Sequence, residues 1–184
     1  MQARDSLDTL PVAGLLARAF VPAGPCTQAP PGHSWDALMH LALAQAHRAS
    51  ARGEVPVGAV LVAADGRILA QCANACLHNN DPTAHAELLA LRTGGSVLGN
   101  YRLTGCILVV TLEPCAMCAA AIINARLSGV VYGAADPLAG AVVSQAEYFD
   151  AQSAQHSVWH MGGICSQQCA TVLQDFFAAR RSGT

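Results

Sequence analysis

The sequence contains no lysine, so its ten basic residues are all arginine. Charged residues of both signs make up 12% of the chain, and the formal net charge is -2. The chain therefore lacks the overall positive charge that is typical of nucleic-acid-binding proteins. If RNA is a partner, a few local arginines must contact its phosphates. The high hydrophobic content of 53% excludes an intrinsically disordered chain. A length of 184 residues allows one domain with a buried core.

Long apolar runs are absent as well. None reaches the roughly 18 residues that a transmembrane helix needs. The start of the chain lacks the positive region of a signal peptide, because Asp5 and Asp8 stand where positive charges belong. The eight cysteines occur in a chain that is longer than secreted disulfide-rich domains usually are. We therefore expect a cytoplasmic protein with reduced thiols and no membrane partner.

The first 33 residues end in VPAGPCTQAPPG, a stretch rich in proline and glycine. We expect residues 1–33 to form a flexible extension and residues 34–184 to form one folded domain. Ser34 is a suitable N-cap for a first helix. Apolar residues with helical spacing follow it, namely Trp35, Leu38, Met39, Ala42 and Ala46.

Strand-like and helix-like segments then alternate along the chain. We expect strands at 57–63 and 68–73 joined by a hairpin turn at Asp65-Gly66, a buried strand at 106–112 and another strand at 129–134. We expect helices within DPTAHAELLALR (81–92), at about 116–125 and at about 166–181. This alternation predicts an α/β fold in which helices cover both faces of one sheet.

The helix in DPTAHAELLALR carries His85 and Glu87 near its start, and Pro114 begins the helix of TLEPCAMC thirty positions later. Cys115 and Cys118 are three residues apart, on one face of that second helix. A helix N-terminus favours thiolates, so the two cysteines form half of a zinc site and His85 is a suitable third ligand. His85 and Glu87 converge on one point only if the site lies beyond the helix end. Both helix N-termini must therefore point at the same metal.

Three protein ligands leave one tetrahedral position for water, which is typical of catalytic zinc. Glu87 is then the candidate general base that takes a proton from this water. Taken alone, Cys115 and Cys118 also fit a redox pair or half of a structural zinc site. Only the combination with His85, Glu87 and Pro114 favours catalysis.

HAE followed by PCAMC matches the H-x-E…P-C-x-x-C signature of zinc-dependent nucleobase deaminases. The segments EVPVGAVLV (54–62), DPTAHAELLALR (81–92), NYRL (100–103) and VTLEPCAMCAAAIINAR (110–126) closely resemble the bacterial tRNA adenosine deaminases. The resemblance covers roughly residues 35–181 and weakens after residue 134. It implies the three-layer α/β/α cytidine deaminase-like fold, with a mixed sheet of about five strands.

The resemblance also implies the reaction and the partners. The enzyme would convert the wobble adenosine of a tRNA anticodon to inosine, with one Zn²⁺ per subunit and a homodimer as the active form. Glu87 would protonate N1 of adenine while activated water attacks C6. Asn74 would hydrogen-bond the flipped nucleoside, Val57 and Ala86 would wall the base pocket, and Asp136 and Phe177 would be further substrate contacts.

The sequence departs from this family after the strand at 129–134. Where the family usually has R-D-x-K-T-G, this chain reads AADPLAG, so Asp136 and Gly140 are kept but Ala135 and Leu138 replace basic residues. Loss of these charges weakens phosphate binding. A deaminase of a free base or nucleoside, of the guanine or cytosine type, is therefore an alternative. A non-catalytic, zinc-stabilised RNA-binding subunit is a second alternative, although it would have no use for Glu87.

The remaining cysteines and aromatic residues have simpler interpretations. Cys165 and Cys169 are more typical of small core residues than of a second metal pair, and the same holds for Cys72, Cys76 and Cys106. Phe176 and Phe177 are either two core anchors or one core residue beside a base-stacking platform. His156 is either an ordinary surface histidine or the counterpart of a family histidine near the dimer or RNA surface. The acidic pair that the family has near the last helix is replaced by Gln167 and Gln168.

Overall fold

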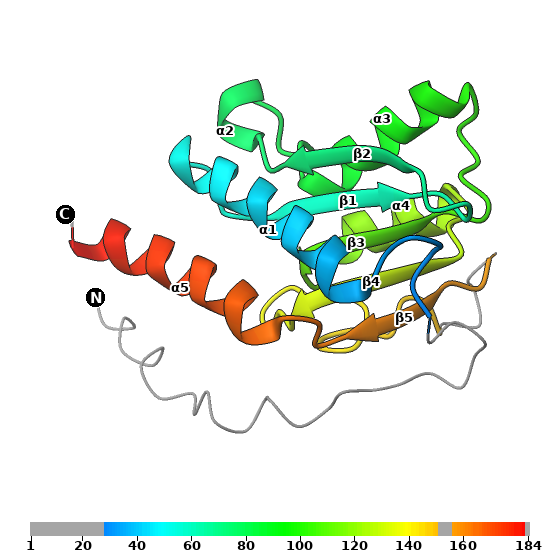
Figure 1. Ribbon diagram of the computed structural model, residues 1–184. Helices are drawn as coiled ribbons and strands as arrows, with labels where there is room; N and C mark the ends of the chain where they lie inside the picture. Colours follow the sequence, from blue (N-terminus) through cyan, green and yellow to red (C-terminus); the bar gives the residue numbers. More distant parts are fainter. Residues whose placement is uncertain (1–27, 151–155, 183–184) are drawn as a thin grey trace.

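The computed structural model describes residues 28–150 and 156–182, which contain one five-stranded sheet in the order β2-β1-β3-β4-β5 (Figure 1). The strands are β1 (Gly58–Val62), β2 (Ile68–Ala73), β3 (Ile107–Leu112), β4 (Gly129–Ala134) and β5 (Trp159–Gly162). Strand β1 pairs antiparallel with β2 and β3, whereas β3, β4 and β5 run parallel to one another. The sheet is therefore mixed, as predicted.

Helices cover both faces of this sheet (Figure 1). Helices α1 (Trp35–Ala51) and α5 (Ser166–Ser182) lie on one face, and α3 (Ala86–Leu98) and α4 (Ala116–Asn124) lie on the other. A short helix, α2 (Cys76–Asn79), follows β2. None of the described helices is long and apolar enough to cross a membrane. The predicted three-layer α/β/α architecture is confirmed.

Strand β3 shows why the molecule has two cores. Side chains alternate between the faces of a strand. Leu108 and Val110 accordingly pack in the cluster beneath α3 and α4, while Ile107 and Val109 pack in the cluster beneath α1 and α5. Both sets are buried, which explains why the sequence of this strand is apolar throughout.

Most predicted element boundaries agree with the structure. Ser34 caps α1 by accepting a hydrogen bond from the Ala37 amide at 3.1 Å. The hairpin turn contains Gly66 at a φ of +88°, where glycine is favoured. Strand β5 and helix α2 were not predicted, because each is only four residues long. The predicted flexible extension falls mainly on residues 1–27, which lie outside the described residues.

The described end of that predicted extension contacts the domain. Nε2 of His33 lies 2.8 Å from the carbonyl oxygen of Gly66. A Cβ atom at Gly66 would lie 2.1 Å from the carbonyl oxygen of Pro31. Residues 30–33 therefore lie against the turn between β1 and β2.

Candidate active site

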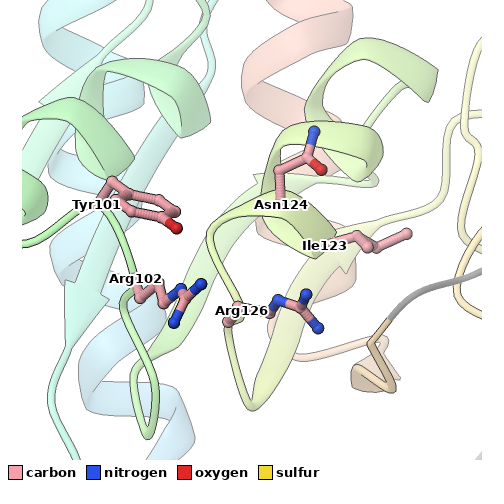
Figure 2. A pocket seen from close by; sticks show the side chains of 5 residues that line it. All are labelled: Tyr101, Arg102, Ile123, Asn124 and Arg126. Atoms are coloured by element: carbon pink, nitrogen blue, oxygen red, sulfur yellow. The ribbon is translucent and has the colours of Figure 1, made fainter.

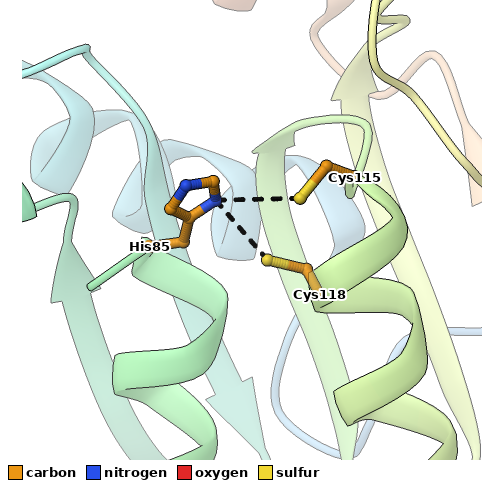
Figure 3. A group of neighbouring side chains, drawn as sticks. All are labelled: His85, Cys115 and Cys118. Atoms are coloured by element: carbon orange, nitrogen blue, oxygen red, sulfur yellow. Dashed lines mark hydrogen bonds between the residues drawn. The ribbon is translucent and has the colours of Figure 1, made fainter. Parts of the chain in front are cut away.

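Helices α3 and α4 begin side by side at one end of the sheet (Figure 3). His85 is the N-cap of α3 and Cys115 is the N-cap of α4, both with extended backbone angles. Nδ1 of His85 lies 3.6 Å from Sγ of Cys118 and 3.9 Å from Sγ of Cys115. One ligand atom from each of the three residues falls within 4.8 Å of the others. The predicted convergence of the two helix N-termini is therefore present.

These separations fit a tetrahedral zinc ion. Bonds of about 2.0 Å to nitrogen and about 2.3 Å to sulfur, at tetrahedral angles, place the N and S atoms roughly 3.6 Å apart. The His85 to Cys118 distance matches this value, and the His85 to Cys115 distance exceeds it only slightly. Across residues 28–150 and 156–182, no other group of His, Cys, Asp or Glu has this arrangement. The donor set therefore suits zinc.

The pKa values of the two thiols are shifted in opposite directions. The pKa of Cys115 is lowered to about 4 by hydrogen bonds from Cys118 and His85, against the effect of burial. The pKa of Cys118 is raised, because its hydrogen bond with Cys115 and its burial both favour the thiol. The hydrogen bond with Cys115 raises the pKa of His85. Because a cysteine binds metal as the thiolate, binding of a metal cation would release the proton of Cys118.

Glu87 lies on the first turn of α3, interacts with His85 and Cys118, and is 4% exposed. Its Oε2 atom has no hydrogen-bond partner within the described part of the chain. Burial raises the pKa of this carboxyl above its usual range. A buried carboxyl with an unpaired oxygen beside a metal site can exchange a proton with a ligand, so its geometry fits the predicted general base.

Three of the predicted substrate contacts lie near this end of the sheet. The backbone amide of Asn74 donates to the Val57 carbonyl oxygen at 2.9 Å. The backbone amide of Ala75 donates to the carbonyl oxygen of Ala84, the residue directly before His85, at 3.0 Å. Val57 and Ala86 are buried in the same apolar cluster as Cys118. The structure therefore brings Asn74, Val57 and Ala86 to the site, while their contacts with a substrate stay predictions.

Asp136 and Phe177 are placed differently. Oδ1 of Asp136 accepts hydrogen bonds from the amides of Leu138 and Ala139 at 3.0 and 3.1 Å, so it is engaged within its own loop. Phe177 is 44% exposed on α5, which covers the opposite face of the sheet from α3 and α4. Its ring contacts the buried Phe176 edge to face. Neither residue joins the cluster around His85.

The other cysteines only partly match their predicted core positions. Cys106 and Cys169 are buried, as predicted. Cys72, Cys76 and Cys165 are half-buried, and Cys165 precedes α5 at a φ of +51°. The Cys165 carbonyl oxygen accepts a hydrogen bond from the Cys169 amide at 3.1 Å, at the start of α5.

Two buried glutamates, Glu54 and Glu113, were not predicted as functional residues. Glu54 is 1% exposed and accepts a hydrogen bond from the His78 amide at 2.7 Å. Glu113, which is 2% exposed, immediately precedes Pro114 and Cys115. A charged residue between a buried strand and a proline was the signal that could have identified it. His156 is half-buried and its Nε2 lies 2.7 Å from the Leu127 carbonyl oxygen, and both interpretations of this residue stay predictions.

A surface cavity of about 340 Å³ lies near the opposite ends of α3 and α4 (Figure 2). Tyr101, Arg102, Ile123, Asn124 and Arg126 line it. The Arg102 guanidinium lies 5.3 Å from the centre of the Tyr101 ring. Because α3 and α4 carry the ligand cluster at their N-termini, this cavity is separate from the candidate active site.

The zinc-type ligand cluster agrees with the family of the proteins to which this chain is similar. Residues 33–134 match the cytidine and deoxycytidylate deaminase zinc-binding region. The tRNA-specific adenosine deaminase of Agrobacterium fabrum is 46% identical over 144 residues, covering 78% of this chain and 94% of the relative. The enzyme of the same name from Haemophilus influenzae is 43% identical over 144 residues, covering 78% of this chain and 83% of the relative.

A solved structure from work on A-to-I editing by tRNA:A34 deaminases at the wobble position of transfer RNA has the same fold. It is 46% identical, with a TM-score of 0.72, and the match covers 74% of this chain and 98% of that chain. The five-stranded mixed sheet with helices on both faces is thus the cytidine deaminase-like fold. From its sequence and its fold, the chain belongs to the tRNA-specific adenosine deaminases, a family of zinc-dependent hydrolytic deaminases.

Proposed function

We propose that this protein converts adenosine to inosine at the wobble position of a tRNA anticodon, with one zinc ion per subunit. The observation that carries the proposal is the cluster of His85, Cys115 and Cys118 at two adjoining helix starts, with the buried Glu87 beside it. Membership of the tRNA-specific adenosine deaminases selects adenosine in tRNA over a free base. We assign the deaminase domain to residues 34–184. We expect the enzyme to act in the cytoplasm.

His85, Cys115 and Cys118 would hold the zinc ion, which when bound supplies an acidified water as the nucleophile. Glu87 accepts a proton at its carboxylate from the attacking water and delivers it to N1 of adenine. The regenerated carboxylate then takes the remaining proton of the hydroxyl group added at C6 and passes it to the exocyclic nitrogen, which departs as ammonia. Desolvation suits Glu87 to this task, because it brings the two protonation states of the carboxyl closer in free energy.

The base would be held at the same end of the sheet. The side-chain amide of Asn74 can hydrogen-bond the nucleoside, since Asn74 is buried directly after β2. Val57 and Ala86 would wall the pocket through their packing with Cys118. Enzymes of this chemistry act on a base that is out of its stack, and such a pocket suits a flipped wobble adenosine.

The outer face of α4 supports a homodimer. Its sequence, AMCAAAIIN, has one polar residue, at the end. A helix that is apolar all round is normally buried, yet Met117, Ala120 and Ile123 are each only half-buried. A second copy of the chain would cover this face together with Tyr101, which is 70% exposed. Light scattering should then give twice the subunit mass for the wild type, and Ile123→Asp should give monomers.

The test of the proposed activity uses zinc-loaded protein and an anticodon stem-loop RNA that carries adenosine at the wobble position. Inosine is detected by sequencing the cDNA, because inosine in the RNA pairs with cytidine and its position is therefore read as guanosine. We expect conversion of the wobble adenosine alone, with no change in a control RNA that has guanosine there. Absence of inosine with zinc fully bound contradicts the proposal. Ammonia released from free guanine or cytosine, without inosine in RNA, would instead support a free-base deaminase.

A further inference from the structure

We propose that Glu113 is a positioning residue for Cys115, because it fastens the loop of residues 136–144 to the turn that carries this predicted zinc ligand. The inference rests on the proposed zinc site. It assigns Glu113 no contact with the metal or the substrate. Its effect reaches the site through the main chain.

The Glu113 carboxylate is the centre of a hydrogen-bond network. Its Oε1 atom accepts from three successive amides, those of Val142 at 3.1 Å, Val143 at 2.8 Å and Ser144 at 2.9 Å. Its Oε2 atom accepts from the Asp136 amide at 3.0 Å and from the Ser144 hydroxyl. Successive amides that converge in this way form an anion-binding nest. Here the anion is a side chain of the same protein.

The same loop also bonds to the main chain around Cys115. The Ala141 amide donates to the Pro114 carbonyl at 2.9 Å, and Gly140 pairs with Cys115 in an isolated β-bridge. A Cβ atom at Gly140 would lie 2.5 Å from the Glu113 carboxyl carbon, so the loop approaches as closely as glycine allows. The loop is therefore bound on both sides of Pro114 in the chain, by the Glu113 carboxylate before it and by the bridge to Cys115 after it.

Cys115 depends on this loop more than the other cysteine does. Cys118 lies inside α4 and is fully buried, so helical hydrogen bonds and packing fix it. Cys115 is the N-cap residue, is half-buried, and its side chain makes no capping hydrogen bond to the helix. Because an N-cap lies at the end of the helical hydrogen-bond ladder, its bridge with Gly140 is a main determinant of its position. Release of the loop would let the Cys115 sulfur move relative to Cys118 and His85.

The variant Glu113→Gln tests this inference. Its amide NH₂ would meet the Asp136 amide, so a donor would face a donor where the wild type has a hydrogen bond. We expect zinc affinity to fall by about 10- to 100-fold, the usual effect of changing a group that orients a metal ligand, and zinc transfer to a chelator to be correspondingly faster. The cobalt-substituted protein should also show a changed thiolate-to-metal absorption band. Neither measurement requires deaminase activity.

Glu54→Gln is the matched control, because Glu54 is buried to the same extent but binds the amide of His78 in another segment. We expect it to release zinc as slowly as the wild type. If Glu113→Gln releases zinc at the wild-type rate, or no faster than Glu54→Gln, the inference is wrong. Ser144→Ala should accelerate release by a smaller factor, and it tests the inference even if Glu113→Gln does not fold. Failure of the wild type to bind zinc would refute the proposed function itself.

Discussion

Glu87 and Glu113 are both almost completely buried and both lie within two residues of a predicted zinc ligand, yet their surroundings are opposite. Oε2 of Glu87 has no hydrogen-bond partner among the described residues, and burial raises the pKa of the carboxyl. Both oxygens of Glu113 accept hydrogen bonds from the loop around Ser144. Burial would raise the pKa of Glu113 too, but these hydrogen bonds outweigh it and the pKa is lowered.

The difference shows that depth alone does not decide what a buried carboxyl does. Backbone amides around Glu113 stabilise its charged form, so it stays ionised and holds chain segments together. At Glu87 burial outweighs the hydrogen bonds from its own amide and from Cys118, so the pKa is raised and the carboxyl changes its protonation state more readily. A carboxyl of the first kind is a structural centre, and one of the second kind is suited to move protons. Matching substitutions at the two positions should therefore have opposite consequences.

The largest effect is expected for Glu87→Gln. The substitution keeps the shape of the side chain but removes the proton acceptor, so the rate of inosine formation should fall by about 10²–10⁴-fold. The free energy of unfolding should not decrease, because no hydrogen bond to Oε2 is lost. Single-turnover assays on the stem-loop RNA and urea unfolding would measure both quantities. Zinc content is the control, and a fully loaded variant with wild-type activity would contradict the assigned role.

Glu113→Gln should show the reverse pattern in stability. Replacing an acceptor of the Asp136 amide by a donor leaves buried polar groups unsatisfied, which costs about 1–3 kcal/mol. Urea unfolding at the same saturating zinc concentration as for Glu87→Gln measures the difference, since bound metal itself adds stability. If the two variants are equally stable, the contrast between the two glutamates is wrong.

Local signals explain why much of the fold and the ligand cluster could be predicted. Strand β4 was predicted at 129–134, as found, because apolar β-branched residues form a short run there. Cys115 and Cys118 stand at the start of a helix, and His85 stands at the start of another; Pro114, predicted to begin the first of these helices, lies just before its N-cap. Helix starts are determined by neighbouring residues. A cluster built from two such starts is therefore readable from the sequence.

Contacts between distant segments explain what was missed. The partners of Glu113 lie between residues 136 and 144, and no local pattern shows that this loop returns to Pro114. The predicted contact of Asp136 with substrate stays a prediction; in the structure its backbone amide donates to the distant Glu113. Strand β5 has four residues and depends on pairing with β4, a partner about thirty residues earlier in the chain. Such pairings carry no periodic signature of their own.

Gly140→Ala tests how tightly the loop is seated on Glu113. The new Cβ atom would lie 2.5 Å from Oε2 of Glu113 and 2.6 Å from the Asp136 carbonyl oxygen, so the loop must shift. We expect the free energy of unfolding to fall by roughly 1–2 kcal/mol. Gly95→Ala is the control, because its Cβ would meet only ordinary contacts inside α3. That variant should gain roughly 0.5–1 kcal/mol, and a loss at Gly95 equal to that at Gly140 would contradict the explanation.

The smallest effect is expected for Ser144→Ala, which removes a single hydroxyl donor to Glu113. Its loss should lower the free energy of unfolding by about 0.5–1.5 kcal/mol. Ser96→Ala is the exposed control, since the Ser96 hydroxyl donates only to the Arg92 carbonyl on the surface of α3, and it should have little effect. Combining Ser144→Ala with Glu113→Gln should cost less than the sum of the two, because both changes disrupt one network. Strict additivity in urea unfolding would show that Ser144 and Glu113 act independently, and the carboxylate would then not be the common centre that distinguishes Glu113 from Glu87.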